Sequence, residues 1–133
     1  LTVAQTISDA MALVVTTPQE LSLADVRKSI DFCRQVGLEI LGVVENMGGI
    51  VCEHCGEQVS IFGSGGGERM ASQQAVPFLG KIPMNSRMVE AGDQGKLDEL
   101  AEDSTLDINK AYEQVVDNIL GDAGQPVERK ATA

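Results

Sequence analysis

The chain has 133 residues, with 10 basic and 20 acidic side chains and a formal net charge of −10. This length corresponds to one domain. The acidic balance argues against a nucleic-acid partner, because phosphate binding requires clustered Lys and Arg. No apolar run approaches the roughly 20 residues of a membrane-spanning helix, so no membrane partner is expected.

The first residues carry no targeting signal. Leu1 to Gln5 lack the charged region and the cleavage site of a signal peptide, and the cytoplasm is therefore the expected location. Because the sequence does not start with Met, we expect it to begin part-way into a longer protein.

Strands and helices are predicted to alternate in the first part of the chain. The apolar run Met11–Val15 predicts a strand buried on both faces, as in a parallel sheet. Ser22 is the expected N-cap of an amphipathic helix that ends at Gly37. A second strand is predicted from about Glu39 to Val44. Together these elements predict a βαβ unit.

The region 46–67 interrupts this alternation. It is rich in glycine and contains two short alternating pieces, which predict an insertion folded as a small hairpin. The acidic stretch 98–103 is interpreted as solvated surface. The elements expected after the hairpin are a helix over 66–74, a strand over 78–82, short helical pieces around 86–91, an amphipathic helix over 105–120 and a disordered tail or linker over 121–133.

Cys52 and Cys55 form a C-x-x-C pair within this insertion. At this spacing both thiolates can ligate one metal centre, but zinc or an iron–sulfur cluster usually takes four ligands. Cys33 is expected to be a small buried residue of its helix, and His54 to point away from the pair. The other ligands would come from outside this chain, or two copies would share a centre on their two-fold axis. Thiol–disulfide exchange and a purely structural pair are the alternatives.

Two other features each have a functional and a plainer interpretation. The glycine run 63–67 does not match the Walker A pattern G-x-x-x-x-G-K-[ST] and is interpreted as backbone freedom before a helix. Asn46 follows a strand's carboxyl end, where open α/β sheets bind ligands, and its amide suits a nucleobase edge. A simple turn residue is the plainer interpretation. Glu45 and Pro83 have the same two interpretations.

Several motifs follow one another along residues 1–95. They are Val14–Glu20 (VVTTPQE), Asp25–Lys28 (DVRK), Leu41–Met47 (LGVVENM), Cys52–Gly56 (C-x-x-C-G), Ile61–Arg69 (IFGSGGGER) and Val76–Pro83 (VPFLGKIP). In this combination they resemble the carboxyl-terminal half of the Mrp/ApbC-type iron–sulfur cluster carriers, which are MinD-like P-loop NTPases. The pairing of C-x-x-C with F-G-x-G-G-G-E-R is specific to that family.

This resemblance implies a fold, a cofactor and site residues. The fold is α/β, a parallel sheet flanked by helices over residues 1–120, with the Cys-bearing insertion at about 46–67. Cys52 and Cys55 match the family's cluster ligands, which implies a homodimer that bridges a [4Fe–4S] cluster and transfers it to apo-proteins. Asn46 matches the asparagine that contacts adenine, and Pro83 lies in the loop on the other side of that base.

The chain also departs from the family pattern. The family's Walker A loop and its Mg²⁺-coordinating aspartates would lie upstream of Leu1, so no catalytic residue is assigned. Full-length members bind ATP and Mg²⁺ and hydrolyse ATP slowly, whereas we expect this chain alone to be inactive. Asn85 stands where the family often has Asp. Two alternative hypotheses for the function are a structural zinc-binding module and a MinD-type regulatory ATPase without a cluster.

Overall fold

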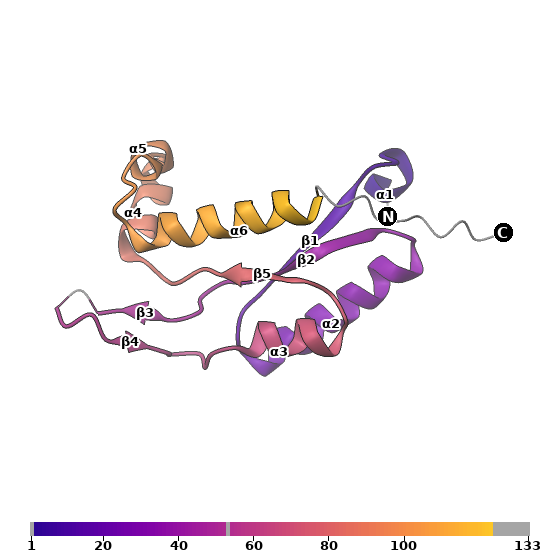
Figure 1. Cartoon of the computed structure of the whole chain (residues 1–133), viewed down its shortest axis with the longest axis horizontal. Helices are drawn as coiled ribbons and strands as arrows, with labels where there is room; N and C mark the ends of the chain where they lie inside the picture. The colour runs from indigo at the N-terminus through magenta and orange to yellow at the C-terminus, as the bar shows by residue number, and fades with distance from the viewer. Residues whose placement is uncertain (1, 53, 124–133) are drawn as a thin grey trace.

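The computed structural model describes residues 2–52 and 54–123. Its centre is a sheet of three parallel strands in the order β1-β2-β5 (Figure 1). A separate antiparallel pair, β3 and β4, forms a hairpin. The strands are β1 (Met11–Thr16), β2 (Glu39–Glu45), β3 (Ile50–Val51), β4 (Gln58–Val59) and β5 (Phe78–Lys81).

Helices cover both faces of the sheet, which confirms the predicted α/β class. Helices α2 and α3 pack on one face and α6 crosses the other (Figure 1). None of the helices in the described residues is long and apolar enough to cross a membrane. The helices are α1 (Thr2–Thr6), α2 (Glu20–Gln35), α3 (Gly66–Gln73), α4 (Ser86–Gln94), α5 (Leu97–Ala101) and α6 (Asp107–Ala123).

The central strand β2 contributes to two apolar cores. Val43 and Val44 are consecutive, so their side chains point to opposite faces of the sheet, and both are buried. Val43 packs in the core under α2 and α3, which includes Leu23, Ile30 and Met70. Val44 packs in the core under α6, which includes Leu79, Ile82, Ile108 and Val115. Full burial of each such side chain contributes about 1.5–3 kcal/mol.

The prediction that the first strand is buried on both faces is wrong. Met11, Leu13 and Val15 of β1 alternate along one face and are exposed, Val15 by 54%. The reason is tertiary: α6 contacts β5 and β2, and no described helix covers β1 on that side. The apolar run correctly predicted a strand, but it did not indicate whether helices cover one or both faces of that strand.

The start of α2 also differs from the prediction. The helix begins at Glu20 after Gln19, and no side chain caps it. The hydroxyl of Ser22, the predicted N-cap, instead accepts a hydrogen bond from the Thr17 N–H at 3.3 Å and lies 3.2 Å from the Thr16 hydroxyl. Ser22 therefore ties the first turn of α2 to the end of β1. Gly37 follows the helix in the left-handed conformation (φ +71°), as predicted.

The acidic stretch 98–103 is only partly solvated surface. It contains most of α5, whose Leu100 is buried. The buried Asn109 side chain donates to the carbonyl oxygens of Leu100 and Asp103, both at 2.8 Å. Hydrogen bonds from the hydroxyl and N–H of Thr105, and the nearby Arg87, lower the pKa of Asp103. Helix α6 reaches Ala123, and the rest of the predicted tail, 124–133, lies outside the described residues.

Candidate functional site

The C-x-x-C pair lies at the tip of the hairpin. In the β3–β4 ladder Ile50 pairs with Val59. Beyond the ladder, the Cys52 N–H donates to the Glu57 carbonyl oxygen at 2.9 Å, and the Gly56 N–H donates to the Cys52 carbonyl oxygen at 2.8 Å. These bonds close a tight turn that contains both cysteines. The hairpin projects beyond the sheet, at the opposite end of the molecule from α1 (Figure 1). This agrees with the prediction that the region 46–67 is an insertion folded as a small hairpin.

The two cysteines differ in accessibility. Cys52 is partly buried, whereas Cys55 is exposed. Within residues 2–52 and 54–123, no group of three or more His, Cys, Asp or Glu side chains is arranged to hold a metal ion. Cys33, which lies on α2 and is partly rather than fully buried, does not join the pair in such a group. The described part of the chain thus offers two thiolates and not a complete set of metal ligands.

A groove of about 1170 Å³ brings most of the predicted site residues together. Its lining includes Asn46, Pro83, Cys52 and His54, while Cys55 is not among the lining residues. The remaining wall is largely apolar and comes from the hairpin, the segment after β5, the first turn of α4 and the start of α6. It includes Met47, Ile50, Ile82, Met84, Met88, Leu106 and Tyr112.

Asn46 and Pro83 follow the ends of adjacent strands. The Asn46 N–H donates to the Thr16 carbonyl oxygen at 2.7 Å, and its side-chain oxygen accepts a hydrogen bond from the Met47 N–H at 2.8 Å. Met47 has a positive φ of +57°, which is uncommon outside glycine. The Asn46 side-chain oxygen is therefore engaged by the neighbouring backbone, an arrangement compatible with the plainer interpretation as a turn residue. Next to it, the Ile82 N–H donates to the Glu45 carbonyl oxygen at 2.7 Å and places Pro83 beside this turn.

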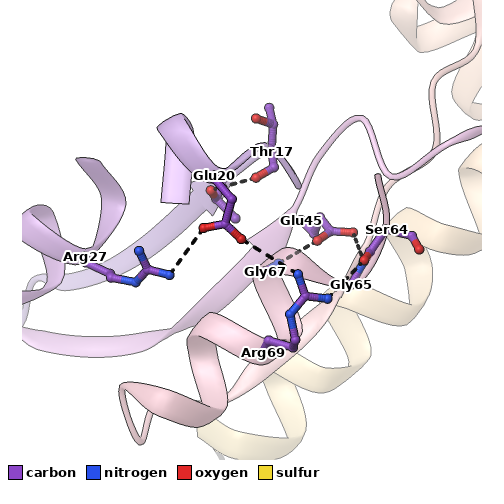
Figure 2. Close-up of polar contacts among 9 residues, drawn as sticks. Thr17, Glu20, Arg27, Glu45, Ser64, Gly65, Gly67 and Arg69 are labelled. Atoms are coloured by element: carbon purple, nitrogen blue, oxygen red, sulfur yellow. Dashed lines mark hydrogen bonds and ion pairs between the residues drawn. The ribbon is translucent and has the colours of Figure 1, made fainter. Parts of the chain in front are cut away.

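Glu45 has a role that the sequence did not reveal. This last residue of β2 is fully buried. One carboxylate oxygen accepts a hydrogen bond from the Gly67 N–H at 2.6 Å, and the other accepts one from the Gly65 N–H at 3.3 Å (Figure 2). Both N–H groups belong to the start of α3, where backbone donors have no helical partner and the helix dipole favours a negative charge. The carboxylate thus caps α3 from a distant part of the chain.

Exposed charged groups add a second link between α3 and α2. The Arg69 guanidinium donates to the Ser64 carbonyl oxygen at 3.3 Å and lies 3.9 Å from a Glu20 carboxylate oxygen. Glu20 in turn lies 3.8 Å from Arg27 (Figure 2). Solvent-exposed pairs of this kind each contribute about 0–1 kcal/mol. These exposed contacts therefore add little to the free energy of unfolding, and their main effect is to orient the segment around Arg69.

The glycine run has the expected backbone role and an additional steric one. Gly63 and Gly65 have positive φ values of +84° and +69°, as the backbone-freedom interpretation requires. A Cβ atom on Gly66 would lie 2.6 Å from the Pro18 carbonyl oxygen, and one on Gly67 would lie 3.0 Å from the Glu45 Cβ. The absence of side chains lets α3 approach the ends of β1 and β2 closely enough for Glu45 to reach its amides.

A parallel α/β sheet with a groove beyond the carboxyl ends of its strands is the arrangement of nucleotide-binding α/β proteins. A family model described as "ParA: NUBPL iron-transfer P-loop NTPase" matches residues 1–120. The chain therefore belongs to this family of iron-transfer P-loop NTPases, which agrees with the resemblance found in the sequence.

Curated relatives carry names of one kind. The cytosolic Fe-S cluster assembly factor NUBP2 of Bos taurus is 49% identical over 85 residues, covering 64% of this chain and 31% of the relative. The cytosolic Fe-S cluster assembly factor CFD1 of Saccharomyces cerevisiae is 54% identical over 78 residues, covering 59% of this chain and 27% of the relative. The matched part of the chain thus spans about a third of the length of these relatives.

Solved structures share the fold. A nucleotide-binding protein from Archaeoglobus fulgidus, in complex with ADP and with Co found by PIXE, superposes with a TM-score of 0.64 and 36% identity, covering 74% of this chain and 41% of that one. The cell division protein MinD of Aquifex aeolicus superposes with a TM-score of 0.58 over 88% of this chain and 45% of its own. At 19% identity, the MinD match supports the MinD-like fold alone.

The glycine contacts predict opposite effects for two Gly→Ala substitutions. Gly66→Ala forces a Cβ against the Pro18 carbonyl oxygen and should lower the free energy of unfolding by about 1–3 kcal/mol. Gly92→Ala, in α4, meets nothing within 4 Å and should raise the free energy of unfolding by about 0.5–1 kcal/mol, because Ala favours a helix over Gly. Urea unfolding followed by circular dichroism measures both. Equal stability of the two variants would contradict the close packing of α3.

Proposed function

We propose that this chain holds an iron–sulfur cluster and passes it to apo-proteins, as the cysteine-bearing part of a nucleotide-binding carrier in the cytoplasm. The observation that carries the proposal is the shared groove, which has Asn46 and Pro83 on its wall together with Cys52. The names of the relatives, cytosolic Fe-S cluster assembly factors, support the same function and location. The cluster is the cargo of this carrier.

Two copies of the chain would complete the ligand set. Cys52 and Cys55 supply two thiolates, and an iron–sulfur cluster usually takes four. Two hairpin tips meeting on a two-fold axis would supply the other two thiolates and bridge one [4Fe–4S] cluster in a homodimer. The hairpin and its return segment have exposed apolar side chains, which suit a surface covered by a second copy. They are Val51, Val59, Ile61 and Phe62.

Cluster transfer would proceed by exchange of thiolate ligands. An acceptor thiolate would bind an iron atom as Cys55, the more exposed of the two, leaves it. The exchange would then be repeated at Cys52 and at the same two cysteines of the second copy, and no electron needs to move in any of these exchanges. The net charge of −10 would favour encounter with acceptors that carry basic patches, mainly through the association rate.

Asn46 and Pro83 would form the base-binding side of a nucleotide site. The Asn46 side-chain oxygen already accepts from Met47, so its amino group would donate to the adenine edge. The ring of Pro83 would contact the face of the base. The structural relative from Archaeoglobus fulgidus contains ADP, which supports this assignment. No Walker A motif occurs in the 133 residues, so the groups that hold the phosphates and Mg²⁺ would belong to another part of the full-length protein.

Anaerobic reconstitution with iron and sulfide tests the cluster proposal. The expected product is a brown dimer with absorption at about 400 nm and about four irons per dimer. Cys52→Ser/Cys55→Ser should remain colourless, and the control Cys33→Ser should reconstitute like the unaltered chain. The readouts are the absorption spectrum, the iron content and the mass in solution. A colourless monomer that binds zinc through Cys52 and Cys55 would contradict the proposal and favour a structural zinc module.

The nucleotide assignment is tested by Asn46→Asp in the full-length protein. This change keeps an oxygen that can accept from the Met47 N–H and removes the amino group. We expect ADP to bind about tenfold more weakly, as for the loss of one hydrogen bond worth about 1.5 kcal/mol, while iron content stays unchanged. Calorimetry measures the affinity. Gln114→Glu is the control, since this exposed α6 residue undergoes the same change from amide to carboxylate and does not line the groove. Unchanged ADP affinity in Asn46→Asp would reject Asn46 as an adenine ligand.

A further inference from the structure

We infer that Glu45 is a positioning residue for the cysteine pair. Its carboxylate joins the two ends of the hairpin insertion and thereby sets how Cys52 and Cys55 present their thiolates, without contacting a metal itself. This inference rests on the proposed metal-binding function of the pair. It assigns a task to a fully buried acidic residue that neither ligates metal nor lines the groove.

The outgoing end of the insertion starts at Glu45 itself. Glu45 is paired with Thr16 of β1 and with Lys81 of β5, so its backbone is held on both sides. The segment after it has further anchors of its own. The Gly48 N–H donates to the Ile82 carbonyl oxygen at 3.0 Å, and the Met84 N–H donates to the Gly49 carbonyl oxygen at 2.7 Å. The outgoing end therefore does not depend on the Glu45 side chain.

The returning end has weaker anchors. The returning strand pairs with the outgoing one through the short β3–β4 ladder. After this ladder Ile61 and Phe62 are exposed, and the chain then meets the ends of β1 and β2 at the glycine run. There the Glu45 carboxylate binds the N–H groups of Gly65 and Gly67. The exposed Arg69 guanidinium adds a hydrogen bond from a side chain to the Ser64 carbonyl oxygen. Loss of the carboxylate would therefore free the returning end while leaving the outgoing end in place.

The two contacts at the start of α3 require a carboxylate at position 45, because both of its oxygens accept hydrogen bonds. Among the described residues no Lys or Arg forms an ion pair with Glu45, so its partners are the backbone N–H groups at the start of α3. A buried carboxylate is costly without such donors. Glutamine in its place would present N–H donors where the glycine amides also donate, and one of the two contacts would be lost.

A freer returning end would weaken metal binding at the tip. Cys52 and Cys55 lie between the two ends, and holding two thiolates in one orientation costs conformational entropy when one end of the hairpin can move. Residues that orient metal ligands typically contribute 10–100-fold to metal affinity. We expect an effect at the lower end of this range, because Glu45 acts through the hairpin backbone.

The test is titration of the chain with Co²⁺, followed by its thiolate-to-metal and ligand-field absorption bands. Glu45→Gln should bind Co²⁺ about tenfold more weakly than the unaltered chain, with weaker ligand-field bands at saturation. Glu39→Gln, at the exposed other end of β2, is the matched charge control. Ile30→Val is the stability control, because it weakens the core under α2 away from the hairpin. Both controls should keep the unaltered affinity at a temperature where all the proteins are folded.

Arg69→Gln keeps the inference testable if Glu45→Gln does not fold. It removes the exposed contacts of Arg69 with the Ser64 carbonyl oxygen and with Glu20 and should weaken Co²⁺ binding by about twofold to threefold. Unchanged affinity in every folded variant would overturn the positioning role and leave the metal site intact. An equal loss in Ile30→Val would also overturn that role, since the effect would then follow general stability. Failure of the unaltered chain to bind Co²⁺ would instead reject the metal-binding function itself.

Discussion

The contact between the Glu45 carboxylate and the glycine amides at the start of α3 joins distant parts of the chain at the ends of β1 and β2. A carboxylate taken out of water needs N–H donors, and the first turn of a helix provides them. To reach them, the helix approaches the strand ends so closely that a side chain on Gly66 would collide with the Pro18 carbonyl oxygen and one on Gly67 would be crowded by Glu45. Three motifs that are distant in the sequence therefore meet at one point, since the TTP, ENM and GGGER segments supply Pro18, Glu45 and the two glycines.

The four consecutive residues 43–46, at the end of β2 and just after it, have different roles. Val43 and Val44 fill the cores on opposite faces of the sheet. Glu45 holds the returning end of the hairpin, and Asn46 lies on the groove wall. Because a strand turns its side chains to alternate faces, the apolar pair fixes the placement of β2, and that placement fixes where the two polar groups stand.

Local patterns predicted most of the architecture and failed where the outcome depends on distant parts of the chain. The three parallel strands, α2, α3, α6 and the hairpin follow from apolar runs, helical spacing and glycine content. The number of covered faces of β1 depends on where α6 packs, and the hydroxyl of Ser22 was drawn to the end of β1 instead of capping its own helix. The positions of Asn46 and Pro83 beyond adjacent strands followed from strand ends and family motifs, whereas the groove that they share with Cys52 was not predicted. The role of Glu45 was not predicted either, because its partners lie 20 and 22 residues further along the chain.

The uncovered face of β1 has a practical consequence for self-association. Among the described strands, β1 pairs only with β2, so its other edge offers a row of backbone donors and acceptors beside an exposed apolar face. Its sequence, MALVVT, has none of the charged or proline residues that usually protect such an edge from joining another strand. Strand pairing at β1 would thus be a route to self-association of this chain that is chemically distinct from the proposed bridging of two hairpin tips by metal. A chelator would dissociate only a metal-bridged pair, so this response would separate the proposed dimer from sheet extension.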